Sequence, residues 1–260
     1  MCTIALLHQL REDHSLVVAA NRDEFYARPA TPPQVLDPHT GAIGGLDHKG
    51  GTWMGLSQAG LFVGLTNQRT HLPPPENARS RGEVVRAALS ATSFDEALGA
   101  LFEIDPSEYP PFNLVLGDGR ELVVLYARPD GIEHVPLEPG LYVLANDRLD
   151  SPLFPKTERF AQRIRPWIDS PWPELSRALR EALGDTSLPE AHLLPDDPDS
   201  PLPAPWRHAL QALCIHTPGY GTCSSTLAAL GEDGPHAYHF AHGAPDQVPF
   251  TDLTALLARA

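Results

Sequence analysis

Short apolar runs bounded by turn residues dominate the first third of the chain and predict β-strands. The first two runs are joined by the polar stretch REDHS, which predicts a hairpin. Glycine-rich junctions such as HKGG and QAG supply the positive φ values that tight turns require. Residues 44–69 (GGLDHKGGTWMGLSQAGLFVGLTNQR) therefore predict a meander. The predicted strands of this part are 3–9, 16–20, 41–46, 52–57 and 61–66.

The apolar positions then change to a helical spacing. Residues 83–90 place Val84, Val85, Ala88 and Leu89 on one helical face, and residues 94–102 repeat the pattern. The same criteria predict strands 113–117, 121–127, 141–145, 224–230 and 237–241, helices within 156–168 and 173–183, and a short C-terminal helix.

The order of these elements favours one fold class. Strands arrive as neighbouring hairpins and not as alternating βαβ units, so antiparallel sheets are expected. Two helical blocks must each cover an apolar sheet face. The sequence thus predicts an α+β protein, a four-layer α-β-β-α sandwich of antiparallel sheets, formed as a single domain over residues 1–260.

The composition of the chain argues against some classes of binding partner. The 260 residues include 19 basic and 33 acidic side chains, a formal charge of −14, which argues against nucleic acid and anionic membranes. No apolar run reaches the roughly 18 residues that a transmembrane helix needs, and no secretory signal is evident. The three cysteines have no Cys-x-x-Cys spacing, so neither a disulfide framework nor a zinc site is indicated. We expect a reduced, cytoplasmic protein.

Cys2 directly follows the initiator methionine. Removal of Met1 would leave Cys2 with a free α-amine, whose ordinary pKa of about 7.7–8.0 suits a base near neutrality. Its thiol has a pKa of about 8.5, which a nearby arginine would lower further. One residue would then supply both nucleophile and base. The alternative interpretation is a small, half-buried residue at the start of an edge strand.

The polar stretch Asn-Arg-Asp-Glu at 21–24 ends the second predicted strand. Hairpin pairing would bring Arg22 or Asp23 beside Cys2, at a Cα separation of about 4.5–5.5 Å. A guanidinium there would stabilise a thiolate, and a carboxylate would hold the α-ammonium group. A salt-bridged turn without catalytic function is the alternative.

Several motifs occur in the order of a known family. They are MCT, NRDEF, GGTWMGLSQAGLFVGLTNQR, SRGE, LANDRLDSPLFPK and YGTCSST. Together they resemble the NRDE family, whose animal members are called transport and Golgi organisation protein 2. That family is similar to the N-terminal-nucleophile (Ntn) hydrolases and, at a distance, to bile-salt hydrolases and penicillin V acylases, which are amidases with an N-terminal cysteine.

The resemblance implies roles for individual residues. Cys2 would be the nucleophile and its own amine the base, with Arg22 and Asp23 as its positioning partners. Whether Asp23 or Glu24 supplies the carboxylate stays open, because the spacing differs. Asn67 and Asn146, each following a predicted strand, would donate to the oxyanion, although asparagine at a strand end is also a common turn residue.

Further residues of these motifs are candidates for substrate binding. Trp53 is either a core residue or a pocket wall. Cys223 stands where the family usually has arginine, which removes a cation from the site. The candidate substrate-binding residues are Asn21, Glu24, Trp53, Arg69 and Cys223.

Two functions follow from the resemblance. The first is cysteine amidohydrolysis of a linear, non-peptide amide or acyl bond. The second is non-catalytic binding and trafficking of haem or an acyl lipid, with Cys2, Cys223 or a histidine as a haem ligand. Both imply a small-molecule partner and no resident cofactor. No metal site is predicted either, because His236 and His242 of HAYHFAH share a strand face that His239 does not.

Overall fold

The computed structural model describes residues 2–70, 75–149, 151–197, 200 and 202–258. Its first sheet, which we call the N-terminal sheet, has the strand order β10-β1-β2-β12-β13-β14, and β11 pairs with β12. All its pairings are antiparallel. Its strands are β1 (Thr3–His8), β2 (Leu16–Phe25), β10 (Gly140–Leu144), β11 (His216–Thr217), β12 (Tyr220–Gly231), β13 (Gly234–Ala241) and β14 (Thr251–Asp252).

The second sheet, the meander sheet, has its strands in chain order from β3 to β9. Each strand pairs antiparallel with the next one along the chain. The strands are β3 (Gln34–Asp37), β4 (Ala42–Gly44), β5 (Met54–Leu56), β6 (Phe62–Asn67), β7 (Phe112–Gly117), β8 (Leu122–Arg128) and β9 (Gly131–Pro136).

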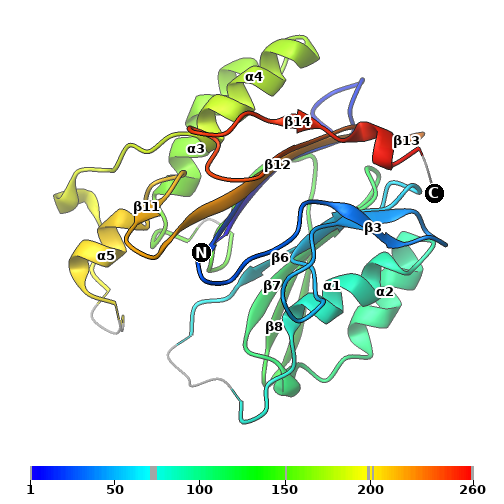
Figure 1. Ribbon diagram of the computed structural model, residues 1–260, viewed down its shortest axis with the longest axis horizontal. Coiled ribbons are helices and arrows are strands. Elements are labelled where there is room, and N and C mark those ends of the chain that lie inside the picture. Colours follow the sequence, from blue (N-terminus) through cyan, green and yellow to red (C-terminus); the bar gives the residue numbers. More distant parts are fainter. Residues whose placement is uncertain (1, 71–74, 150, 198–199, 201, 259–260) are drawn as a thin grey trace.

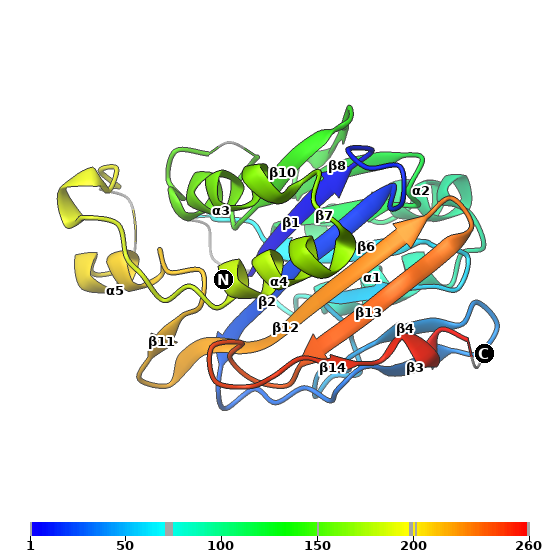
Figure 2. The same cartoon turned by 90° about the horizontal axis from the view of Figure 1, so that it is seen from above.

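Helices cover the outer face of each sheet, so the molecule has four layers (Figure 1). Helices α1 (Arg81–Leu89) and α2 (Phe94–Phe102) pack on the meander sheet. Helices α3 (Lys156–Ile164) and α4 (Trp172–Leu183) pack on the N-terminal sheet, and α5 (Ala204–Ala209) lies beyond its end (Figure 2). Short 3₁₀ turns lie at Pro106–Glu108, Arg165–Trp167, Ala191–Leu193 and Thr254–Leu256.

Three apolar cores separate the four layers. In β1, Ile4 and Leu6 face the core between the two sheets, whereas Ala5 and Leu7 face the core under α3 and α4. Both faces of the strand are therefore buried, and its sequence is an uninterrupted apolar run because neither face meets water. The predicted α-β-β-α sandwich of antiparallel sheets is confirmed.

The predicted elements differ from the structure at several boundaries. Strand β2 does not end at residue 20 but continues through the NRDE stretch to Phe25, because β12 pairs with it as far as Phe25. Strand β1 lies between β10 and β2, so Cys2 precedes an interior strand and not an edge strand. The edge strands β3 and β9 and helix α5 were not predicted. In place of the expected C-terminal helix there is a 3₁₀ turn, and residues 259–260 lie outside the described residues.

None of the described helices combines the length and the apolar character that a bilayer crossing requires.

Helix α1 approaches the meander sheet closely at Gly55. A Cβ there would overlap Leu89 Cδ1 and lie 2.7 Å from the Ile43 carbonyl oxygen. We expect Gly55→Ala to lower the free energy of unfolding by about 1–3 kcal/mol. Gly99→Ala is the control, because that Cβ meets nothing within 4 Å and an exposed helical alanine should add about 0.5–1 kcal/mol. Urea unfolding measures both, and equal effects would contradict the close packing.

Candidate active site

The pairing of β1 with β2 brings the NRDE stretch to Cys2. Thr3 pairs with Asn21, and continuing this register sets Cys2 opposite Arg22. On the other side of β2, β12 pairs Arg22 with Ser224 and Asp23 with Thr222, so Cys223 is the extra residue of a β-bulge. The hairpin geometry predicted from the sequence therefore holds, although the polar residues lie within the strand and not in a turn.

Cys2 lines a pocket of about 270 Å³ between the two sheets, the Cys2 pocket. Candidate residues from separate motifs converge here. The pocket is lined by Arg22, Asp23, Glu24, Trp53, Asn67 and Arg81, among others. The structure thus brings together four of the five predicted catalytic residues.

The thiol of Cys2 is less acidic than the sequence led us to expect. Burial raises its pKa, and this effect outweighs the lowering by Arg22. A cation beside the sulfur is therefore insufficient to keep a thiolate at neutral pH. A base must remove the proton when the thiol reacts.

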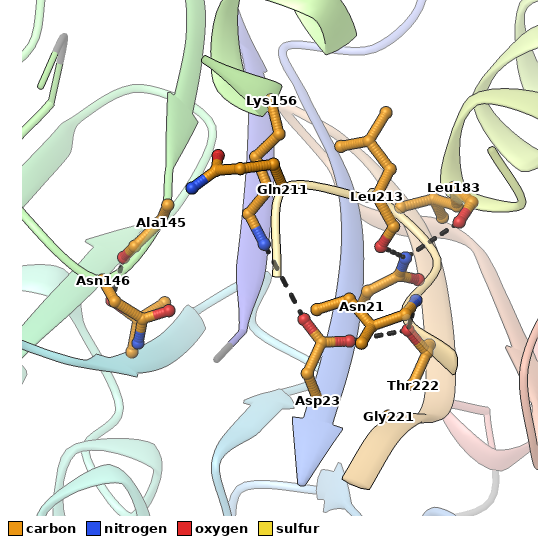
Figure 3. A network of polar contacts seen from close by, with 12 residues as sticks. Asn21, Asp23, Ala145, Asn146, Lys156, Leu183, Gln211, Leu213, Gly221 and Thr222 are labelled. Carbon is orange, nitrogen blue, oxygen red and sulfur yellow. Dashed lines mark hydrogen bonds and ion pairs between the residues drawn. The ribbon is translucent and has the colours of Figure 1, made fainter. Parts of the chain in front are cut away.

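The Asp23 carboxylate points toward Lys156 at the start of α3 (Figure 3). Its Oδ1 accepts a hydrogen bond of 2.7 Å from Thr222 Oγ1, and its Oδ2 lies 3.9 Å from Lys156 Nζ. Both side chains of this ion pair are fully buried. Lys156 begins α3, and sequence reasoning missed it because its spacing resembles that of any exposed helical lysine.

Burial acts against both charges of this pair. It raises the pKa of Asp23 and lowers that of Lys156, and each partner's charge opposes the shift of the other. Among the described residues Lys156 Nζ has no hydrogen-bond partner, so Asp23 is the group that compensates its charge. The pair is sensitive to loss of either partner, because an uncompensated buried charge is costly.

Glu24, the other candidate carboxylate, lies in a different environment. It is partly exposed and forms a 2.8 Å ion pair with Arg28. Of the two adjacent acidic residues, Asp23 alone contacts the buried lysine and threonine.

Asn67 and Asn146 meet where the two sheets are joined by polar contacts. Asn146 Nδ2 donates to the Asn67 carbonyl oxygen at 2.8 Å. Beside them, Thr66 Oγ1 donates to the Ala145 carbonyl oxygen and Asn113 Nδ2 donates to Thr66 Oγ1. These bonds connect β6 and β7 of the meander sheet to the end of β10. The two predicted oxyanion donors are thus adjacent, although only Asn67 lines the Cys2 pocket.

A second pocket of about 730 Å³, the apolar pocket, adjoins the first and shares Asn67 and Arg81 with it. Asn146 and Arg69 line this pocket. Its apolar lining is Leu153, Phe154, Leu194, Leu202 and Leu210. Arg81 belongs to the SRGE motif, but that motif gave no indication that Arg81 lies at the junction of the two pockets.

The remaining candidates lie elsewhere. Cys223 lines a third pocket of about 360 Å³, the Cys223 pocket, together with His216 and His242. Asn21 is fully buried and, within the described residues, lies outside all three pockets. Its Nδ2 donates to the carbonyl oxygens of Leu183 and Leu213 at 2.9 and 2.8 Å (Figure 3). Asn21 therefore fastens β2 to the end of α4 and to the segment before β11.

Comparison with known proteins identifies the family. The profile described as Transport and Golgi organisation 2 matches residues 1–240. The chain belongs to this family. A bovine transport and Golgi organization protein 2 homologue is 32% identical over 239 residues, covering 85% of this chain and 84% of its own length. The human homologue is 29% identical over 237 residues with the same coverage, and the Drosophila melanogaster protein is 25% identical over 247 residues, covering 87% and 85%.

Solved structures agree with the fold. A mutant conjugated bile acid hydrolase from Clostridium perfringens superposes with a TM-score of 0.50 at 12% identity, covering 99% of this chain and 94% of its own. A Caenorhabditis elegans orthologue of N-acylethanolamine-hydrolyzing acid amidase has the same score and identity, covering 68% and 85%. The family member described here therefore has an Ntn-hydrolase-like fold.

We expect substitutions of Lys156 and Asp23 to be thermodynamically coupled. Lys156→Met alone should lower the free energy of unfolding by about 3–5 kcal/mol, because it removes the buried cation that lies 3.9 Å from the Asp23 carboxylate. In an Asp23→Asn background the same change should cost at least about 1 kcal/mol less. Urea unfolding of the two single variants and the double variant measures the coupling.

Arg177→Met is the control for this cycle. It breaks the exposed Arg177–Glu181 ion pair of 2.9 Å and removes the guanidinium from the Trp167 ring, and it should cost no more than about 1 kcal/mol. Additive effects of the Lys156 and Asp23 substitutions would contradict the pairing.

Proposed function

We propose that this protein hydrolyses a linear acyl amide through a thioester on Cys2. The observation that carries the proposal is the Cys2 pocket, whose lining brings together Cys2 of the N-terminal segment, Arg22 and Asp23 of β2, and Asn67 of β6. The two superposed proteins are a conjugated bile acid hydrolase and an N-acylethanolamine-hydrolysing amidase, and their names support an amide of a large apolar acid as substrate.

The proposed reaction requires Cys2 to be the first residue of the mature chain. Met1 lies outside the described residues. The α-amine of Cys2 takes the thiol proton, and the sulfur attacks the amide carbonyl carbon to form a C–S bond. The C–N bond then breaks, the leaving amine takes the proton, and a thioester remains. Water, deprotonated by the same amine, hydrolyses the thioester and restores the thiol.

The surrounding residues serve separate steps of this scheme. Arg22 stabilises negative charge on the sulfur, which offsets part of the cost of burying a thiolate. Asn67 and Asn146 donate to the oxyanion of the tetrahedral intermediate, and neither adds a competing charge. Asp23 lies one residue beyond Arg22 in β2 and is the carboxylate that holds the α-ammonium.

The adjoining apolar pocket accommodates the acyl group. Its leucines and Phe154 offer apolar contact, and Asn67 at its junction with the Cys2 pocket would place the scissile carbonyl between the two spaces. The smaller and more polar Cys2 pocket then receives the amine.

Turnover of coumarin amides with acyl chains from acetyl to palmitoyl tests this scheme. We expect fluorescent amine release to increase with acyl length, and the N-terminal peptide to gain the mass of the acyl group. Cys2→Ala should reduce the rate by about a thousandfold or more and abolish the mass gain, with an unchanged far-ultraviolet circular dichroism spectrum. Intact mass should show Cys2 as the first residue. Turnover by protein that retains Met1, or undiminished turnover by Cys2→Ala, would contradict the mechanism.

A second function, binding of a haem-like or acyl ligand without turnover, is favoured by the apolar pocket itself. Its volume of about 730 Å³ falls in the range of small-molecule sites, and His208 in its lining offers an imidazole to haem iron. Haemin titration should then shift the Soret band, and His208→Ala should abolish the shift while Cys2→Ala preserves it. Absence of a spectral change with the wild-type protein would count against haem as cargo.

A further inference from the structure

Three metal-ligating side chains converge near the start of β12, on the edge of that strand that also pairs with β13 and outside the proposed catalytic scheme. Cys214 and His216 flank Ile215 just before β12, and Asp246 belongs to the segment between β13 and β14. Cys214 Sγ lies 3.1 Å from Asp246 Oδ1 and 3.7 Å from His216 Nε2. His216 Nε2 lies 3.1 Å from the same oxygen, Asp246 Oδ1. One donor atom of each residue thus faces the same point.

These separations suit a tetrahedral metal ion. Zn²⁺ binds thiolate at about 2.3 Å and imidazole nitrogen or carboxylate oxygen at about 2.0–2.2 Å, so its ligand atoms lie about 3.3–3.6 Å apart. Each of the three observed separations differs from this range by a few tenths of an ångström. The ligand set of one thiolate, one imidazole and one carboxylate is of the kind that zinc and related divalent ions take.

A catalytic triad does not explain the arrangement. In a triad the two imidazole nitrogens contact different partners, the nucleophile and the carboxylate. Here the same nitrogen of His216 approaches both Cys214 and Asp246. Cys214 is also buried, which leaves its sulfur little access to a substrate.

We propose that Cys214, His216 and Asp246 bind a zinc-class divalent metal ion, with a fourth position left for water or a ligand. Binding replaces the thiol proton, which passes to solvent, and uses the Nε2 lone pair of His216. The ion has a path of entry, because His216 and Asp246 are partly exposed and His216 lines the Cys223 pocket. Metal binding at this site does not require the proposed amidase activity.

A bound metal ion would also restrict the motion of the segment that positions Asp23. Ile215, between the two ligands, donates its backbone N–H to Thr222 Oγ1 at 2.8 Å, and Thr222 Oγ1 donates to Asp23 Oδ1 at 2.7 Å. The Thr222 N–H donates back to the Ile215 carbonyl oxygen. Immobilising Cys214 and His216 therefore fixes the threonine that orients the Asp23 carboxylate.

Cobalt substitution tests the site on the full-length chain. The protein is first treated with a chelator, and Co²⁺ is then titrated. We expect one Co²⁺ per chain, with thiolate-to-cobalt charge-transfer absorption in the near ultraviolet and the visible bands of a tetrahedral ion, which Zn²⁺ abolishes by competition. Cys214→Ser should remove the charge-transfer band, and Cys2→Ser and Cys223→Ser should retain it.

His216→Gln provides a second test, because Cys214 is buried and its replacement could disturb folding, whereas His216 is exposed. His216→Gln should weaken Co²⁺ binding by more than about 100-fold and leave the circular dichroism spectrum unchanged. Loss of a residue that only hydrogen-bonds to a metal ligand typically costs about 10–100-fold, so the larger effect identifies His216 as a ligand itself. Zn²⁺ should raise the Tm of the wild-type chain and not that of His216→Gln. Absence of stoichiometric binding, or a charge-transfer band that survives in Cys214→Ser, would overturn the proposal.

Discussion

The pairing of β2 on both of its sides is the constraint on which the rest of the molecule depends. Strand β1 holds one edge from Leu16 to Asn21, and β12 holds the other from Leu16 to Phe25. The strand therefore cannot leave the sheet where its sequence becomes polar, and the NRDE residues are carried into the interior. Each buried polar group then needs a partner. Asn21 finds backbone carbonyls, and Asp23 finds a threonine and a lysine.

Side chains alternate between the two faces of the sheet along this polar segment, so neighbouring residues serve different purposes. The side chains of Asn21 and Asp23 bind groups of α4 and α3, whereas Arg22, between them, lines both the Cys2 pocket and the Cys223 pocket. A single run of polar residues thus anchors the helices on one side and supplies the Cys2 pocket with a cation on the other. The meander sheet shows the same arrangement. Thr66 and Asn113 hydrogen-bond across to the other sheet, whereas Asn67, the residue after Thr66, lines the Cys2 pocket.

The sequence was sufficient for those features that depend on local pattern. Apolar runs and turn residues predicted the β1–β2 hairpin and, with it, that Arg22 or Asp23 would lie beside Cys2; the register of the structure selects Arg22. Contacts between distant segments could not be predicted in this way. Lys156 is separated from Asp23 by more than a hundred residues, and nothing in its own helix distinguishes it from an exposed lysine. The end of β2 was misjudged because the polar residues resemble a turn until β12 is placed beside them. Cys214 and His216 lack a recognisable zinc spacing, and Asp246 joins them only through the fold.

The energetics of the Lys156–Asp23 pair indicate why it lies where it does. At 3.9 Å and an effective dielectric constant of about 20, the attraction is about 4 kcal/mol. Desolvation of two fully buried ions costs several kcal/mol each, so the pair adds little net stability. Its effect is positional, because a carboxylate held by Lys156 on one oxygen and Thr222 on the other has little freedom to rotate. Arg22 and Asp23 are adjacent in a strand that is paired on both sides, so fixing the carboxylate also fixes the backbone that presents the guanidinium to the Cys2 pocket.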